Sequence, residues 1–167
     1  MTIVFGIDPG SVYTGFGVIK RHGQMFAHVD SGRICAGRAG VDFSGRLSNI
    51  YDDLSALLQQ YRPDYIAIER VFSQVNVASA LKLGQARGVA LLACEQYRSG
   101  LVSEYSPRAV KKSVTGYGGA EKAQVQFMVK QLLKLDCVLS EDAADALALA
   151  IFCASTVRTQ HVKKESV

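Results

Sequence analysis

The chain has 167 residues, of which 49% are hydrophobic and 20% are charged, with a net charge of +4 at pH 7. This length fits one domain with a proper hydrophobic core, and the low charge content excludes a disordered chain. The apolar runs fall short of the roughly 18 residues needed to cross a bilayer. The N-terminus also lacks the basic start and cleavage site of a signal peptide, so we expect a cytoplasmic protein.

The four cysteines are widely separated, with no CxxC pair and no nearby histidine. A zinc site or a disulfide framework is therefore not expected. Cys94 and Cys153 lie in apolar stretches of helical type, so we expect both thiols to be buried and reduced.

Three β-type segments open the chain, and the short turns PGS and RHGQ between them predict an antiparallel meander. The segments are 3–8, 13–20 and 25–35. After a Gly/Ala-rich loop at 37–40, apolar residues at helical spacing predict a helix from Phe43 to Tyr61, which Pro63 ends. YIAIE at 65–69 is apolar nearly throughout, which is typical of a central strand covered on both faces.

The second half of the chain alternates between helices and a strand. The predicted elements are a helix from Ala78 to Arg98, a strand at 101–105, a short helix from Arg108 to Thr115, and, after the break GYGG, helices from Ala120 to Leu135 and from Ser140 to about Thr156. The pattern predicts an α/β domain over 1–157, a mixed five-stranded sheet with helices on both faces. This order matches the ribonuclease H-like fold. Residues 158–167 are predicted to be a basic, flexible tail.

The last predicted helix carries two aspartates on its inward face. Asp142 and Asp145 are three residues apart and therefore adjacent, and the same face continues to Leu149 and Phe152. Capping is the structural alternative, because Ser140 begins the helix and acids in a first turn offset the helix dipole. It accounts poorly for two neighbouring buried charges that repel each other. We therefore favour an active site.

Asp8 and Glu69 each end an apolar strand, and ligands gather at the carboxyl ends of strands in α/β sheets. A turn role stays open for Asp8, which precedes Pro-Gly, but glutamate is a poor turn former. Four carboxylates without a histidine or cysteine partner need a cation in a shared pocket, and oxygen ligands favour Mg²⁺ or Mn²⁺. Two such ions about 4 Å apart can clamp the attacking and leaving oxygens of a phosphoryl displacement. The residues thus predict a metal-dependent phosphodiesterase.

Basic residues supply the complement to these acids. RAVKKSVTGYGGAEK places Arg108, Lys111, Lys112 and Lys122 around a Gly-rich break, and Lys122 near a helix start suits a scissile phosphate. Lys112 is interpreted as an ordinary surface lysine. Without the four acids, 19 basic residues face 11 acidic ones, which suits a polyanionic substrate. Phe72 is predicted either to stack on bases beside the site or to join the core.

Several longer motifs stand in order from about Ile3 to Ile151: GIDPGS with TGFGVI, YIAIE followed by VF, SALKLGQARGV, VKKSVTGYGGAEK and DAADALALAI. In these motifs the chain closely resembles the RuvC family of Holliday junction resolvases. The resemblance implies a ribonuclease H-like fold, Mg²⁺ dependence and a homodimer. It also implies paired symmetric nicks in four-way junction DNA that leave 5′-phosphate and 3′-hydroxyl ends. The implied roles are homologous recombination and DNA repair, together with a branch-migration motor of RuvA and RuvB type.

The resemblance also implies roles for individual residues. The catalytic and metal-binding acids are Asp8, Glu69, Asp142 and Asp145, and Lys122 joins them in catalysis. The implied DNA contacts are Phe72, Asn76, Arg108, Lys111 and Lys122. The implied dimer interface comprises Ser79, Leu81, Lys82, Leu83, Gln85, Ala86 and Arg87. Val75 stands where the family commonly has a basic residue, so no DNA contact is carried over to that position.

Two other classes of protein are alternatives to a nuclease. A sugar-kinase or actin-like ATPase domain shares the fold and an early Asp-x-Gly turn, but it needs a second similar domain to enclose ATP. A chain of 167 residues cannot hold that second domain. A junction-binding protein without catalytic activity would not need to keep all four acids.

Overall fold

The computed structural model describes the backbone of residues 1–37, 40–70 and 76–164, and the side chains of these residues up to Val157. A five-stranded sheet with the order β3-β2-β1-β4-β5 forms its centre. The elements along the chain are β1 (Thr2–Asp8), β2 (Tyr13–His22), β3 (Met25–Cys35), α1 (Phe43–Tyr61), β4 (Tyr65–Glu69), α2 (Val77–Tyr97), β5 (Val102–Tyr105), α3 (Pro107–Thr115), α4 (Lys122–Leu133) and α5 (Glu141–Lys164).

The sheet is mixed, as the sequence predicts. β2 pairs antiparallel with both β1 and β3, which confirms the meander. β4 then pairs parallel with β1, and β5 pairs parallel with β4. Ile7 is opposite Ile68 in this parallel ladder, so the carboxyl ends of β1 and β4 lie side by side.

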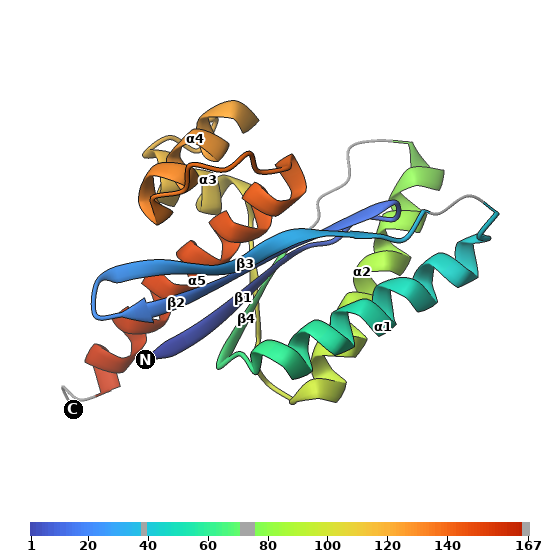
Figure 1. Cartoon of the computed structure of the whole chain (residues 1–167), viewed down its shortest axis with the longest axis horizontal. Coiled ribbons are helices and arrows are strands. Elements are labelled where there is room, and N and C mark those ends of the chain that lie inside the picture. The colour runs from blue at the N-terminus through green and yellow to red at the C-terminus, as the bar shows by residue number, and fades with distance from the viewer. Residues whose placement is uncertain (38–39, 71–75, 165–167) are drawn as a thin grey trace.

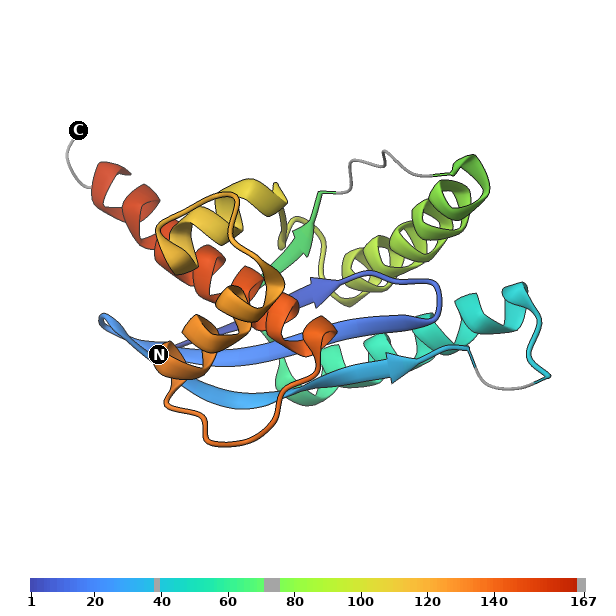
Figure 2. The ribbon, with the colours of Figure 1, turned by 90° about the horizontal axis from the view of Figure 1, so that it is seen from above.

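Helices cover both faces of the sheet (Figure 1). α1 and α2 pack on one face, where they enclose apolar side chains that include Phe5, Ile7, Ile66 and Ile68. α3, α4 and α5 lie on the other face, over a second cluster that includes Val4 and Ala67. The view from above shows the same division into three layers (Figure 2). β1 and β4 are buried on both sides, which explains why they are apolar nearly throughout.

Glycines let α5 lie directly on the sheet. A Cβ atom at Gly6 would stand 1.9 Å from the main-chain oxygen of Ala146, and one at Gly17 would stand 2.7 Å from the main-chain nitrogen of Leu147. Neither position has room for a side chain, because α5 fills the space above it. The GFG sequence of β2 therefore serves close helix packing.

The helix ends agree with the sequence at α1 and differ at α5. α1 runs from Phe43 to Tyr61 as predicted, with Asp42 as its N-cap, whose side chain accepts a hydrogen bond from the Gly45 N–H. α5 ends at Lys164 and not near Thr156, so the predicted end was wrong. Residues 157–164 are mostly polar, but they contain no glycine or proline that would end the helix.

α2 differs from its sequence expectation in two respects. By length and composition it could cross a membrane, with a mean hydropathy of 1.2, whereas the sequence predicts no apolar run of sufficient length. One such helix is weak evidence, because helices of soluble proteins pass the same test. Ala86 is fully buried, so its prediction as a dimer contact was wrong: this side of α2 packs on the sheet of its own chain. Cys94 and Cys153 are buried free thiols, as predicted.

Candidate active site

Side-chain alternation brings two of the predicted acids to one face of the sheet. In β1, Val4 belongs to the core under α5, whereas Phe5 and Ile7 belong to the opposite core. Asp8 continues the alternation on the α5 face. In β4, Ala67 is on the α5 face, so Glu69 emerges there as well. Two neighbouring parallel strands thus present carboxylates side by side at their carboxyl ends.

The start of α5 brings the other two acids to the same place. Ser140 begins the helix, and its hydroxyl accepts a hydrogen bond from the N–H of Ala143 at 3.3 Å. The cap is therefore formed by Ser140, which leaves the carboxylates of Asp142 and Asp145 free of that task. Both aspartates are partly buried. A Cβ atom at Gly15 would stand 2.1 Å from the main-chain oxygen of Asp142, so the first turn of α5 touches β2.

These elements enclose a cleft of about 260 Å³. Acidic and basic side chains line it together with apolar walls: Asp8, Glu69, Asp145, Lys111, Lys122, Pro107, Val110, Val125, Ala148 and Leu149. Asp142 is not among the lining residues, but its charge contributes to the raised pKa of Asp8. The structure therefore brings together the four acids and two of the predicted lysines from β1, β4, α3, α4 and α5.

Burial and mutual repulsion change how these carboxyl groups ionise. Burial, with the charges of Glu69, Asp145 and Asp142, raises the pKa of Asp8 to about 8, although Lys122 opposes the shift. Burial and Asp145 raise the pKa of Glu69. Burial also raises the pKa of Asp145, against the effect of two lysines. A cluster that holds its protons this strongly would be stabilised by a cation.

The lysines approach the cluster from α3 and α4. Lys122 is the first residue of α4, and its Nζ is 3.1 Å from Oε2 of Glu141 in an ion pair whose side chains are 61% and 65% exposed. This hydrogen bond is the main reason why the pKa of Lys122 is raised. Lys111 lines the cleft from α3, whereas Lys112 is exposed, in agreement with its interpretation as a surface residue.

The donor set suits a hard divalent cation. The acids of the cleft offer only oxygen ligands, which Mg²⁺ and Mn²⁺ prefer, and their mutual repulsion is the kind that a cation relieves. Within the described residues, no three Asp, Glu, His or Cys side chains are already arranged to hold one ion together.

Three of the predicted DNA contacts lie outside this cleft or outside the described residues. Asn76 is exposed and caps α2, because its side-chain oxygen accepts a hydrogen bond from the Ala78 N–H at 2.9 Å. Arg108 is exposed on α3, and its stem packs against Gly118. Phe72, like Val75, lies outside the described residues.

Most of the predicted interface residues lie on α2 with their side chains accessible. Ser79, Leu81, Lys82 and Gln85 are exposed, and Leu83 is partly buried. The Nζ of Lys82 is 6.0 Å from the ring centroid of Phe43. Two exposed apolar residues that sequence reasoning missed, Val77 and Leu92, extend this surface. Arg87 differs from these residues, because its guanidinium contacts β4 and β5 of its own chain.

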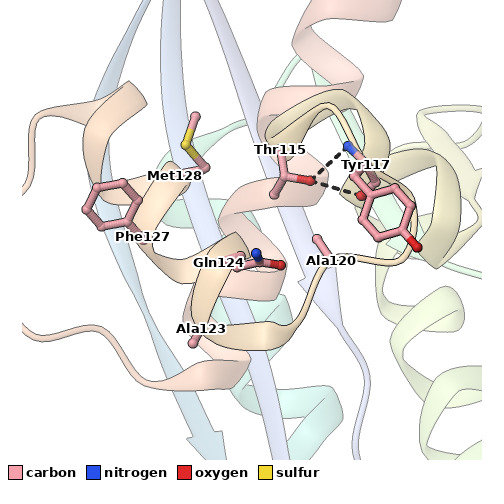
Figure 3. A pocket seen from close by; sticks show the side chains of 7 residues that line it. All are labelled: Thr115, Tyr117, Ala120, Ala123, Gln124, Phe127 and Met128. Atoms are coloured by element: carbon pink, nitrogen blue, oxygen red, sulfur yellow. Dashed lines mark hydrogen bonds between the residues drawn. The ribbon is translucent and has the colours of Figure 1, made fainter.

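A second hollow of about 420 Å³ lies beside α4 (Figure 3). Its α4 residues are Ala123, Gln124, Phe127 and Met128, which occupy the helix face opposite to the cleft residues of the same helix. At its edge the Thr115 hydroxyl donates a hydrogen bond to the main-chain oxygen of Tyr117 at 2.9 Å. None of the predicted catalytic residues lines this hollow, so it is separate from the active site.

Comparisons with known proteins identify the relatives of this chain. The family model described as crossover junction endodeoxyribonuclease RuvC matches residues 4–153. The RuvC protein of Colwellia psychrerythraea is 52% identical over 152 residues, which are 90% of this chain and 86% of that protein. The structure of Thermus thermophilus RuvC in complex with a Holliday junction substrate has a TM-score of 0.86 at 29% identity and covers 96% of this chain and 97% of that chain. The yeast mitochondrial Holliday junction resolvase Ydc2, 13% identical with a TM-score of 0.66 over 98% of this chain and 86% of that chain, shares the fold.

Proposed function

The chain belongs to the RuvC family of crossover junction endodeoxyribonucleases, and from this membership we propose that its cleft hydrolyses phosphodiesters of four-way DNA junctions. The family is one of metal-dependent nucleases, and its chemistry agrees with the acids of the cleft. The observation that supports the proposal most is the joint approach of four carboxylates, from β1, β4 and α5, beside two lysines; burial and the charges of the other three acids raise the pKa of Asp8. The ATPase alternative has no comparable support, because the matching family is one of junction endonucleases.

The proposed metal ligands are Asp8, Glu69, Asp142 and Asp145. We propose Mg²⁺, with Mn²⁺ as a substitute, and two ions per subunit, because four ionised carboxylates carry more charge than one divalent cation neutralises. When bound, such ions stabilise the charge that develops on the phosphodiester during hydrolysis.

The other residues of the cleft act on the substrate directly. Lys111 and Lys122 are proposed to bind the phosphate oxygens, and Lys122 can exchange its exposed partner Glu141 for a phosphate at little cost, about 0–1 kcal/mol. The apolar walls formed by Val110, Val125 and Leu149 exclude water and so strengthen these electrostatic contacts. Phe72, Asn76 and Arg108 remain proposed DNA contacts along the substrate arms.

A homodimer is proposed, with α2 as the contact surface. Val77, Leu81 and Leu92 are 75%, 64% and 50% exposed. Between them, Cβ atoms at Gly84 and Gly88 would meet nothing within 4 Å, so a second helix has room to approach closely. A symmetric pair of active sites matches the two symmetry-related phosphates of a junction, which would permit paired nicks with 5′-phosphate and 3′-hydroxyl ends.

The remaining proposals concern the cellular setting. The family's substrate places the protein in recombination and repair, and a branch-migration motor of RuvA and RuvB type is the proposed partner. DNA-processing relatives favour a location away from the membrane, in the cytoplasm. One domain over 1–157 and a basic tail over 158–167 remain the proposed organisation.

The test compares cleavage of a synthetic four-way junction and of linear duplex DNA, each with Mg²⁺ and with a chelator. We expect cleavage of the junction alone, and only with Mg²⁺. Asp8→Asn should abolish cleavage and leave junction binding in chelator intact, because it removes a proposed ligand without adding bulk. Asp53→Asn, an exposed change on α1, is the matched control. Equal cleavage of duplex DNA, or an active Asp8→Asn variant, would refute the proposal.

A further inference from the structure

Arg87 connects α2 to the strand end that carries a proposed catalytic acid. Its Nε donates a hydrogen bond to the main-chain oxygen of Glu69 at 3.1 Å. Its Nη2 forms an ion pair with Oε2 of Glu104 on β5 at 2.5 Å. The side chain of Arg87 is only 18% exposed, whereas that of Glu104 is 40% exposed. One guanidinium therefore joins two neighbouring strands to a helix.

The two strand ends are also joined to each other. Glu69 is opposite Tyr105 in the parallel ladder between β4 and β5. The N–H of Arg70 donates a hydrogen bond to the main-chain oxygen of Tyr105 at 2.7 Å. The contact from Arg87 adds a support from the helix layer at the residue where β4 ends. The main chain of Glu69 is thus restrained within the sheet and from one of its faces.

Arg87 approaches Glu69 from the face opposite to the cleft. It lies on α2, which covers the face that carries Ile66 and Ile68, and the Glu69 side chain enters the cleft on the α5 face. The groups that shift the pKa of the Glu69 carboxyl are its burial, Asp145, Lys111 and Lys122. The contribution of Arg87 is therefore to the position of the main chain and not to the charge of the carboxylate.

We infer that Arg87 is a positioning residue, which holds the main chain of Glu69 so that its carboxylate points into the cleft. The inference rests on the proposed catalytic role of Glu69. A displacement of about 1 Å at a reacting group can cost on the order of 100-fold in rate, so a single hydrogen bond to this strand end has a large effect.

The experiment measures single-turnover cleavage of a synthetic four-way junction against Mg²⁺ concentration. The variants are Arg87→Met, which removes the donors, and Arg87→Lys, which keeps a cation. Arg98→Met is the matched control, because Arg98 follows α2 and donates its hydrogen bond, at 3.5 Å, to the main-chain oxygen of Asp64 at the other end of β4. Junction binding in chelator and the thermal midpoint are measured for each variant, and Glu69→Gln is included.

We expect Arg87→Met to lower the cleavage rate at least about 10-fold and to raise the Mg²⁺ concentration for half-maximal rate, while junction binding is retained. Arg87→Lys should recover part of the rate, and Arg98→Met should cleave like the wild type. Wild-type cleavage by Arg87→Met would overturn the inference. So would a loss of rate in Arg87→Met that occurs only together with losses of junction binding and thermal midpoint, because a general folding defect would then account for it. An active Glu69→Gln variant would instead refute the proposed role of Glu69.

Discussion

Gly15 and Asp142 approach each other so closely that a Cβ atom at Gly15 would stand 2.1 Å from the main-chain oxygen of Asp142. The contact lies where β2 meets the first turn of α5, one strand away from Asp8, whose partner in the ladder is Gly15. The absence of a side chain at Gly15 thus sets how near the aspartates of α5 come to the acids of the sheet.

Gly15→Ala should therefore lower the cleavage rate strongly, while it lowers the free energy of unfolding only moderately. Because the obstructing atom is main chain, α5 must shift, and an overpacked core costs about 1–3 kcal/mol of unfolding free energy. A shift of about 1 Å in Asp142 can lower the rate on the order of 100-fold. Gly32→Ala is the control, since its Cβ would meet only the movable ring of Phe16 at 3.0 Å. Cleavage rates and denaturant unfolding check this, and a Gly15→Ala variant with wild-type cleavage would contradict it.

This contact also marks the limit of sequence reasoning on the fold. The bounds of α1 and β4 follow from local signals, because apolar spacing and Pro63 define a helix and then a strand. No local signal explains the GFG sequence of β2. Its glycines are explained only by their packing against α5, a helix that comes more than a hundred residues later. The end of α5 was predicted too early for a related reason: polar composition indicates exposure, not the end of a helix.

For the candidate site, too, some features could be predicted from the sequence and others could not. The positions of Asp8 and Glu69 followed from their places after apolar strands, and those of Asp142 and Asp145 from helical spacing. The structure brings all four together, but their roles remain proposals. Arg87 stood in the sequence as one of several interface residues. Its contact with the main chain of Glu69 joins residues 18 positions apart through a helix and a strand, and no residue pattern indicates such a bond.

The stability of the metal-free protein should fall as pH rises from about 4 to about 8. Asp8 has a folded pKa of about 8 against an ordinary value of 3.8, so the folded state holds a proton that the unfolded state has already lost. That stabilisation is complete below the unfolded pKa and is lost as pH rises through the folded one. The raised pKa values of Glu69 and Asp145 act in the same direction. Asp42 acts oppositely, but only at more acidic pH, because its pKa is lowered.

Thermal midpoints measured in chelator across this range check the expectation. Asp8→Asn should remove much of the decline, because the amide does not titrate. Adding Mg²⁺ at pH 8 should raise the midpoint of the wild type more than that of Asp8→Asn, since metal ligation requires the ionised carboxylate. A wild-type midpoint that rises from pH 5 to pH 8 in chelator would contradict the assignment.

Substitution of the cleft lysines should lower the cleavage rate far more than substitution of Lys112 on the surface. Lys111→Met and Lys122→Met should each lower cleavage on the order of 100-fold, because each removes a charge proposed to stabilise the reacting phosphate. Each should also reduce the salt slope of junction binding by about one. Lys112→Met changes the same helix as Lys111 but on its exposed side, so it should leave the cleavage rate near that of the wild type. Equal effects at Lys111 and Lys112 would show that only overall charge matters.

The exposed apolar residues of α2, which are Val77, Leu81 and Leu92, lead to a prediction about assembly. Leu81 is 64% exposed beside the open Gly84, so a carboxylate in its place costs the folded monomer little and would be buried without a partner in a dimer. Leu81→Glu should therefore convert a dimer into monomers at the same protein concentration. Val138→Glu is the control, because Val138 is 96% exposed and lies in the connection between α4 and α5.

Sedimentation equilibrium distinguishes these states, and the nicking pattern of a labelled junction gives an independent readout. A dimer places two active sites on one junction, so the second nick follows before the substrate dissociates. The Leu81→Glu monomer should therefore accumulate singly nicked junctions, whereas Val138→Glu should release paired products like the wild type. A Leu81→Glu variant that stays dimeric would contradict the proposed contact at Leu81, and Leu92→Glu, near the other end of α2, would then test whether this helix takes part at all.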